Sequence, residues 1–118
     1  DSSGGNSSYD YLIMLFSSVD GISKVGYYTG TGSDRSISFG FAPRFLMVKR
    51  ADAAYDWYML DTLRGFVSGN DAFLTLNTTE TSTTSTDFGT PTSTGIDIVG
   101  GLGHINANNA KYIYYAHA

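Results

Sequence analysis

The chain consists of short apolar runs separated by glycine, serine, asparagine and aspartate, a pattern typical of all-β proteins. The clearest run, residues 45–48, has the length of a strand buried on both faces. Pro43 precedes it, where a fixed φ and a missing N–H suit the start of a strand. A second run, residues 57–60, contains the single Trp, and residues 51–56 between the runs are too short for a stable helix. The pattern predicts a central pair of strands joined by a turn.

Weaker runs predict further strands around this pair. Residues 35–39 alternate between polar and apolar, so Ile37 and Phe39 are expected to face inward. The Thr- and Ser-rich tract 78–94, with Phe88 as its only large apolar side chain, is expected to form an exposed loop or an extended edge and to build no core. The other predicted strands are residues 23–28, 72–77, 95–99, 102–106 and 111–117.

Eight or nine short strands and no convincing helix indicate an all-β protein, a β-sandwich of jelly-roll type. Fourteen Gly and 14% aromatic residues agree with this class, and 118 residues suit one domain. We expect the sandwich at residues 19–118, preceded at residues 1–18 by a flexible tail and an apolar extension strand.

The most unusual apolar run lies next to that tail. Residues 1–8 are rich in Ser, Gly and Asn and read as a linker. The run that follows, called the ribbon below, would be apolar on both faces of a strand, so both faces need a cover. It consists of Tyr11, Leu12, Ile13, Met14, Leu15 and Phe16.

Two interpretations of the ribbon stay open. It is either an ordinary strand of its own sandwich or a donor strand that completes a sheet in a neighbouring subunit. Residues 11–17 also align without gaps on residues 112–118, so the ribbon resembles the closing strand of a preceding repeat. A donated ribbon that does not close a ring would give a head-to-tail filament.

Several segments carry a resemblance to a known family. Residues 39–50 contain Gly-Phe-Ala-Pro-Arg-Phe-Leu-Met-Val-Lys-Arg, and residues 57–64 read Trp-Tyr-Met-Leu-Asp-Thr-Leu-Arg. With residues 22–32, 106–107 and 112–116, they resemble an uncharacterised domain family that recurs in phage tail and tail-fibre-like proteins, mainly of aquatic phages. The resemblance covers residues 19–118. It implies a β-rich structural or adhesive module at an extracellular or virion surface, without a catalytic residue set.

Composition narrows the classes of partner. The net charge is −4 and charged residues make up only 15%, which does not favour nucleic acid or an anionic membrane as a partner. No apolar run is long enough to cross a bilayer. Without Cys, no disulfide stabilises the fold.

Candidate catalytic and metal-binding residues are sparse. His104 and His117 lack the spacing of a zinc site, and Asp52 and Asp56 read as turn residues rather than calcium ligands. Glu80, the only Glu, lies in the polar tract, and no paired-carboxylate or Ser-nucleophile motif occurs. We therefore expect no enzyme, no cofactor and no metal. Asp61 and Arg64 are expected to form a turn cap or an ion pair beside Trp57.

Glycans are the second class of partner that the sequence suggests. Tyr55, Trp57 and Tyr58 offer flat amphipathic faces that could contact a sugar. Asn6 and Asn77 each begin an N-x-Ser/Thr pattern and are candidates for N-glycosylation. The sequence thus predicts a non-enzymatic fibre subunit that binds copies of itself through the ribbon. The alternative is a carbohydrate-binding module of a phage tail or receptor-binding protein.

Overall fold

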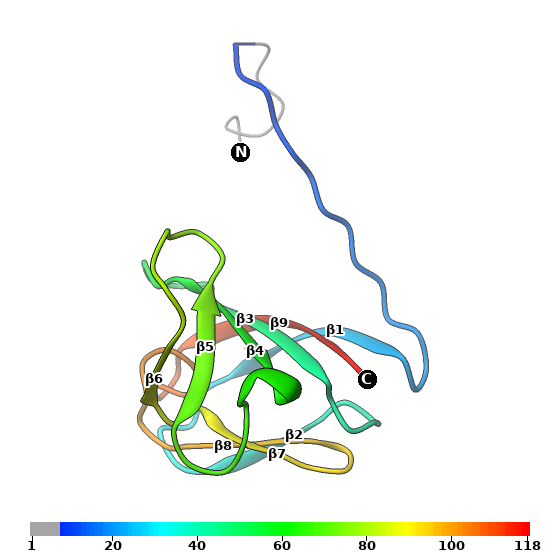
Figure 1. Ribbon diagram of the computed structural model, residues 1–118, viewed down its shortest axis with the longest axis vertical. Helices are drawn as coiled ribbons and strands as arrows, with labels where there is room; N and C mark the ends of the chain where they lie inside the picture. Colours follow the sequence, from blue (N-terminus) through cyan, green and yellow to red (C-terminus); the bar gives the residue numbers. More distant parts are fainter. Residues whose placement is uncertain (1–7) are drawn as a thin grey trace.

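The computed structural model describes residues 8–118, and nearly all of its regular structure is β (Figure 1). Among these residues, nine strands form two antiparallel sheets packed face to face, which confirms the all-β sandwich. The strands are β1 (Ser23–Thr29), β2 (Arg35–Ser38), β3 (Phe45–Arg50), β4 (Trp57–Asp61), β5 (Asp71–Thr75), β6 (Thr83–Thr86), β7 (Gly89–Pro91), β8 (Gly95–Ile98) and β9 (Lys111–His117).

The larger sheet has the order β1-β9-β3-β4-β5-β6 and the smaller has the order β2-β8-β7. The predicted pair, β3 and β4, is confirmed, and it lies inside the larger sheet with Met47 opposite Met59. The closing strand β9 lies between β1 and β3 and pairs with both. The C-terminal strand β9, which is distant in sequence from both neighbours, therefore connects β1 to the rest of the larger sheet.

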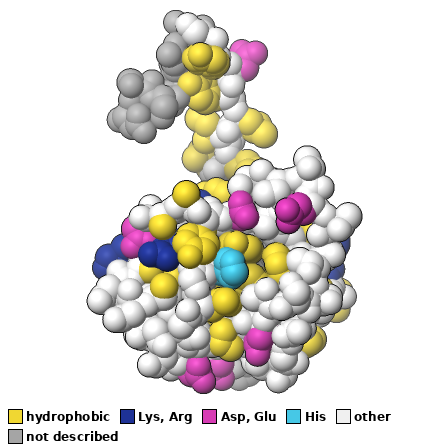
Figure 2. Space-filling model, turned by 90° about the vertical axis from the view of Figure 1, so that its left-hand side faces the viewer, with side chains coloured by type: hydrophobic (Ala, Val, Ile, Leu, Met, Phe, Trp, Pro, Cys, Tyr) yellow, Lys and Arg dark blue, Asp and Glu magenta, His cyan; other side chains and the backbone are white. Residues whose placement is uncertain are grey.

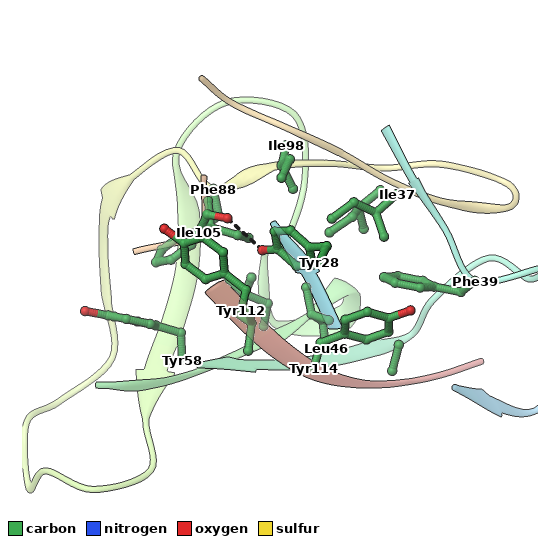
Figure 3. Close-up of a cluster of buried hydrophobic side chains, with 14 of the residues drawn as sticks. Tyr28, Ile37, Phe39, Leu46, Tyr58, Phe88, Ile98, Ile105, Tyr112 and Tyr114 are labelled. Carbon is green, nitrogen blue, oxygen red and sulfur yellow. Dashed lines mark hydrogen bonds between the residues drawn. The ribbon is translucent and has the colours of Figure 1, made fainter. Parts of the chain in front are cut away.

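The core lies between the two sheets (Figure 3). The larger sheet contributes Tyr28, Leu46 and Tyr112, and the smaller contributes Ile96 and Ile98. Ile37 and Phe39 are buried, as their alternation predicts. The hydroxyl of Tyr28 donates a hydrogen bond of 2.7 Å to the main-chain oxygen of Ile105, so this buried polar group is paired.

The Thr- and Ser-rich tract forms one edge of each sheet, because β6 borders the larger sheet and β7 the smaller. The expected edge structure is thus present. Phe88, between these strands, is fully buried, so the expectation that the tract adds nothing to the core is wrong. The chain passes from the larger sheet to the smaller one at Phe88, and Asp71 stabilises this connection. Its buried carboxylate accepts hydrogen bonds from the main-chain N–H groups of Phe88 and Gly89.

Residues 102–106 are a turn and not the predicted strand. Asn106 explains the turn, since its buried side chain accepts a hydrogen bond from the N–H of Thr31 and donates to the main-chain oxygens of Ser33 and Val99. These bonds replace those of a sheet ladder. The part of the chain that the structure describes also contains one short 3₁₀ helix, η1 (Thr62–Arg64), which the sequence did not indicate.

Candidate assembly interface

The ribbon does not belong to either sheet of its own sandwich. Residues 11–16 form no strand. They extend away from the two sheets, and most of the side chains along this segment are hydrophobic (Figures 1 and 2). All six side chains are exposed, and Leu12 and Leu15 each expose 90% of their surface. The interpretation of the ribbon as an ordinary strand of this sandwich is therefore wrong.

The ribbon is anchored at its C-terminal end. The ring of Phe16 packs against that of Tyr115 on β9, with centroids 4.4 Å apart. Ser18 accepts a hydrogen bond from the N–H of Val25, and Val19 forms a β-bridge with Ser23. The point where the ribbon leaves the domain is thus fixed beside β1. Met14 still lies near the larger sheet, beside Met47 and Trp57, while the rest of residues 11–15 extends beyond it.

The face of the larger sheet that points away from the core, called the outer face below, is also apolar. Because side chains alternate along each strand, the register aligns Val25, Tyr115, Met47, Met59 and Leu74 across five strands on this face. A second row contains Tyr27, Ile113, Lys49 and Trp57.

A groove of about 710 Å³ crosses the outer face. None of its lining residues carries a formal charge. The charge of Lys49 lies at one end of the face, where its Nζ donates hydrogen bonds to the main-chain oxygens of Arg50 and Ala53. The groove is lined mainly by Met14, Phe16, Val25, Tyr27, Met47, Trp57, Leu76, Ile113 and Tyr115.

A second hollow lies at the other side of the molecule, beside β5 and β6, where a histidine is surrounded by hydrophobic side chains (Figure 2). It has a volume of about 630 Å³ and is called the His104 cleft. The imidazole of His104 packs against Tyr58 and Tyr55, with ring centroids 4.9 and 5.6 Å away. Burial lowers the pKa of His104, although the nearby Asp56 acts in the opposite direction.

The three aromatic residues predicted to contact glycans do not form one platform. Tyr58 lines the His104 cleft and Tyr55 packs against the His104 ring beside it, whereas Trp57 points to the outer face and lines its groove. Tyr58 is almost fully buried, and burial, with Asp56 nearby, raises the pKa of its hydroxyl to about 12. Alternation along β4 separates Trp57 from Tyr58.

Only one of the two predicted glycosylation positions is described. Asn77 is exposed, but its Oδ1 accepts a hydrogen bond from the N–H of Trp57 and its Nδ2 donates to Asp56. The nitrogen that a glycan would modify is thus engaged in the folded domain. Asn6 lies outside the described residues, and glycosylation at both positions stays a prediction.

The chain matches, over residues 1–118, the family described as Domain of unknown function (DUF7483). The chain belongs to this family. No curated protein matches the chain, and no solved structure does either. The family assignment thus identifies the chain without naming an activity.

Two ion pairs of this family member serve local structure. Asp61 caps η1 by accepting a hydrogen bond from the N–H of Leu63, as a turn cap should. Its ion-pair partner is Arg44 at 3.0 Å and not the predicted Arg64, and this hydrogen-bonded pair lowers the pKa of Asp61. Asp61 also lies at the opposite end of β4 from Trp57. Asp52 pairs with Arg50 at 2.7 Å.

Neither a metal centre nor a membrane-crossing helix is found in residues 8–118. No group of three His, Cys, Asp or Glu side chains in this range lies close enough together to hold a metal ion. Nor does any helix there have the length and apolar character that a bilayer crossing needs.

The sequence indicates the ribbon but not the surface that complements it. The outer face is built from single apolar residues on β1, β9, β3 and β4, and only their register brings them together. One signal was available: residues 45–48 and 57–60 are apolar at every position, which requires a cover on both faces of the sheet. His104 was considered only as a metal ligand, so the aromatic cleft around it was missed.

Proposed function

We propose that this protein is a structural, non-enzymatic subunit that polymerises head-to-tail by donating its ribbon to a neighbouring copy. The observation that carries the proposal is the exposure of six consecutive large apolar side chains on a segment that leaves its own domain. A folded protein rarely exposes such a contiguous apolar surface unless a partner covers it.

The estimated gain from covering the ribbon is large enough to support assembly. Burying an apolar side chain of this size contributes roughly 1.5–3 kcal/mol, so six contribute on the order of 10 kcal/mol before ordering costs. The ribbon projects from one copy and is covered by a different surface of the next, so the contact is heterologous. A heterologous contact that does not close produces a filament, and we assign this filament to an extracellular or virion-surface fibre.

Removal of residues 1–17 tests the proposal. The deletion leaves both sheets and the β-bridge of Val19 with Ser23 intact, so the shortened protein should fold. We expect the full chain to form filaments in negative-stain electron micrographs and the deletion variant to sediment as a monomer. Filaments formed by a folded deletion variant would refute the proposal, as would a full chain that stays monomeric at high concentration.

A second candidate function, carbohydrate binding, is favoured by the His104 cleft. This cleft combines aromatic side chains with the carboxylates of Asp56 and Glu80 and with Thr hydroxyls, a mixture suited to a sugar ring. A glycan array would test it, with Tyr55→Ala as the variant and Trp57→Ala, on the opposite face, as the control. Binding that is lost in Tyr55→Ala and kept in Trp57→Ala supports this candidate, and an array without binding removes it.

A further inference from the structure

The structure offers the donated ribbon several places to bind. Strand addition needs a sheet edge with free main-chain groups, whereas an apolar segment can also lie across a complementary apolar face. The larger sheet has two edges, β1 and β6, and one uncovered face. The likeness of the ribbon to β9 does not provide a place, because β9 of each copy already fills the position between β1 and β3.

The edge at β1 is largely occupied by the chain itself. Gly30 N–H donates to the oxygen of Ala110 and Ala118 N–H to that of Ile22, so the even-numbered residues of β1 face β9. The main-chain groups of odd-numbered residues therefore point to the open edge. There the N–H of Ser23 bonds to Val19 and that of Val25 to Ser18.

Further along this edge, the main-chain oxygen of Thr29 accepts a hydrogen bond from Arg35. This leaves a stretch around Tyr27, too short to pair with six residues. The edge at β6 is free of such contacts but consists only of Thr and Ser, so it would leave the large side chains of the ribbon uncovered.

The outer face matches the ribbon in chemistry and length. Extended residues 11–15 span about 17 Å, and five strands spaced by roughly 4.8 Å span about 19 Å. The groove runs from Val25 and Tyr27 on β1 past β9, β3 and β4 to Leu76 after β5, and it contains no formal charge. The contact of Phe16 with Tyr115 already shows an aromatic side chain from the end of the ribbon packed on this face.

From these observations we infer that the acceptor of the ribbon is the outer face of the larger sheet in a second copy of this chain. Residues 11–15 of one copy lie across the groove of the other, and their apolar side chains contact Tyr27, Trp57 and Ile113. The main-chain groups along the sides of the ribbon stay accessible to water or to the recipient's own ribbon. This inference rests on the proposed function and specifies its partner surface.

Engineered cysteines can locate the contact, because the chain contains no Cys of its own that could form other disulfides. Leu12→Cys is placed in one protein and Tyr27→Cys in a second, larger tagged protein; both positions are highly exposed, at 90% and 84%. The proteins are mixed at assembling concentration and oxidised. We expect a mixed disulfide-linked dimer, and much less of it when Ser93→Cys, exposed beyond the smaller sheet, replaces Tyr27→Cys.

Other occupants of the groove give different products. Equal cross-linking to Ser93→Cys would overturn the inference, because the ribbon would then have no preferred surface. So would a dominant link between two copies of Tyr27→Cys, which indicates outer faces packed on each other. A protein carrying both Leu12→Cys and Tyr27→Cys that only closes on itself would show that the ribbon binds its own face, and this too overturns it.

A substitution pair separates this inference from the proposed function. Tyr27→Glu places a charge in the groove and should raise the concentration needed for assembly at least about tenfold, while the matched Leu63→Glu on η1 leaves it unchanged. If deletion of residues 1–17 abolishes filaments but Tyr27→Glu assembles normally, the outer face is not the acceptor, while the proposal that the ribbon is donated still holds. If the deletion variant still assembles, the proposed function itself fails.

Discussion

His104 lies inside an aromatic cluster in which a charged imidazole would be poorly solvated. Its Nδ1 is buried without a hydrogen-bond partner in the described part of the chain, and Tyr58 and Phe88 pack around the ring. Burial lowers its pKa below the ordinary value, so the folded state binds fewer protons than the unfolded state near that value. The neutral ring is therefore part of the fold.

This predicts a pH dependence of stability that His104→Phe should remove. The contribution is fully present above the unfolded pKa of about 6.5 and is lost as the pH falls from that value through the lowered pKa of the folded state. The free energy of unfolding, measured in urea between about pH 7.5 and pH 5.5, should thus decrease more for the natural protein than for His104→Phe. Parallel decreases in the two proteins would contradict the burial argument.

The comparison with His104→Phe matters because another buried group acts in the opposite direction. Burial raises the pKa of Asp71, so its contribution is fully present below the ordinary carboxyl pKa and is lost as the pH rises through the raised value. This background is common to both proteins and cancels in the difference between them.

At the scale of elements, Gly95 sets the distance between β2 and β8. A Cβ built at Gly95 would lie 1.9 Å from the main-chain oxygen of Ile37, a distance that no neighbouring side chain can relieve by moving. The same pair of strands places Ile96 in the core opposite Ile37. The smaller sheet can therefore pack its isoleucines only if this position has no side chain.

Gly95→Ala should accordingly reduce the free energy of unfolding by about 2–4 kcal/mol. The exposed neighbour Thr94→Ala, which keeps the main-chain hydrogen bonds of the turn, should change it by less than about 0.5 kcal/mol. Chemical denaturation followed by circular dichroism measures both. Similar losses of unfolding free energy in the two variants would contradict this prediction, because β2 and β8 could then move apart to fit a Cβ at Gly95 without loss of stability.

The elements were predictable where a local pattern carries them. The central pair and the inward positions Ile37 and Phe39 follow from runs and alternation, and the structure has them. The prediction of a strand at residues 102–106 was wrong because the Asn106 side chain binds two other loops, one at Thr31 and Ser33 and one at Val99, and no local pattern reveals these contacts. The prediction that the Thr- and Ser-rich tract adds nothing to the core was wrong because Phe88, its one large apolar residue, lies where the chain passes from one sheet to the other and is buried there.

At the scale of the whole molecule, two apolar surfaces remain uncovered on the same chain. The ribbon was visible in the sequence as a run with two apolar faces, whereas its complement depends on the order of strands in the larger sheet. That order puts β9 beside β1 and β3 and so assembles the outer face from distant segments. Of the candidate site, the ribbon could therefore be predicted from the sequence, and the outer face could not.

In the proposed assembly these two surfaces form one contact, with the ribbon of one copy lying on the outer face of the next. The contact needs no catalytic residue, cofactor or metal. It predicts that the outer face is hydrated in the monomer and dry in the assembly. The single Trp of the chain reports this difference, because Trp57 lines the groove.

The most direct test is the emission of Trp57 measured across the concentration range in which the protein assembles. The account predicts a shift to shorter wavelength as assembly proceeds, since the ribbon of a second copy displaces water from the indole. It also predicts no shift in the variant without residues 1–17 over the same range. An unchanged emission wavelength in a sample that forms filaments would contradict the account.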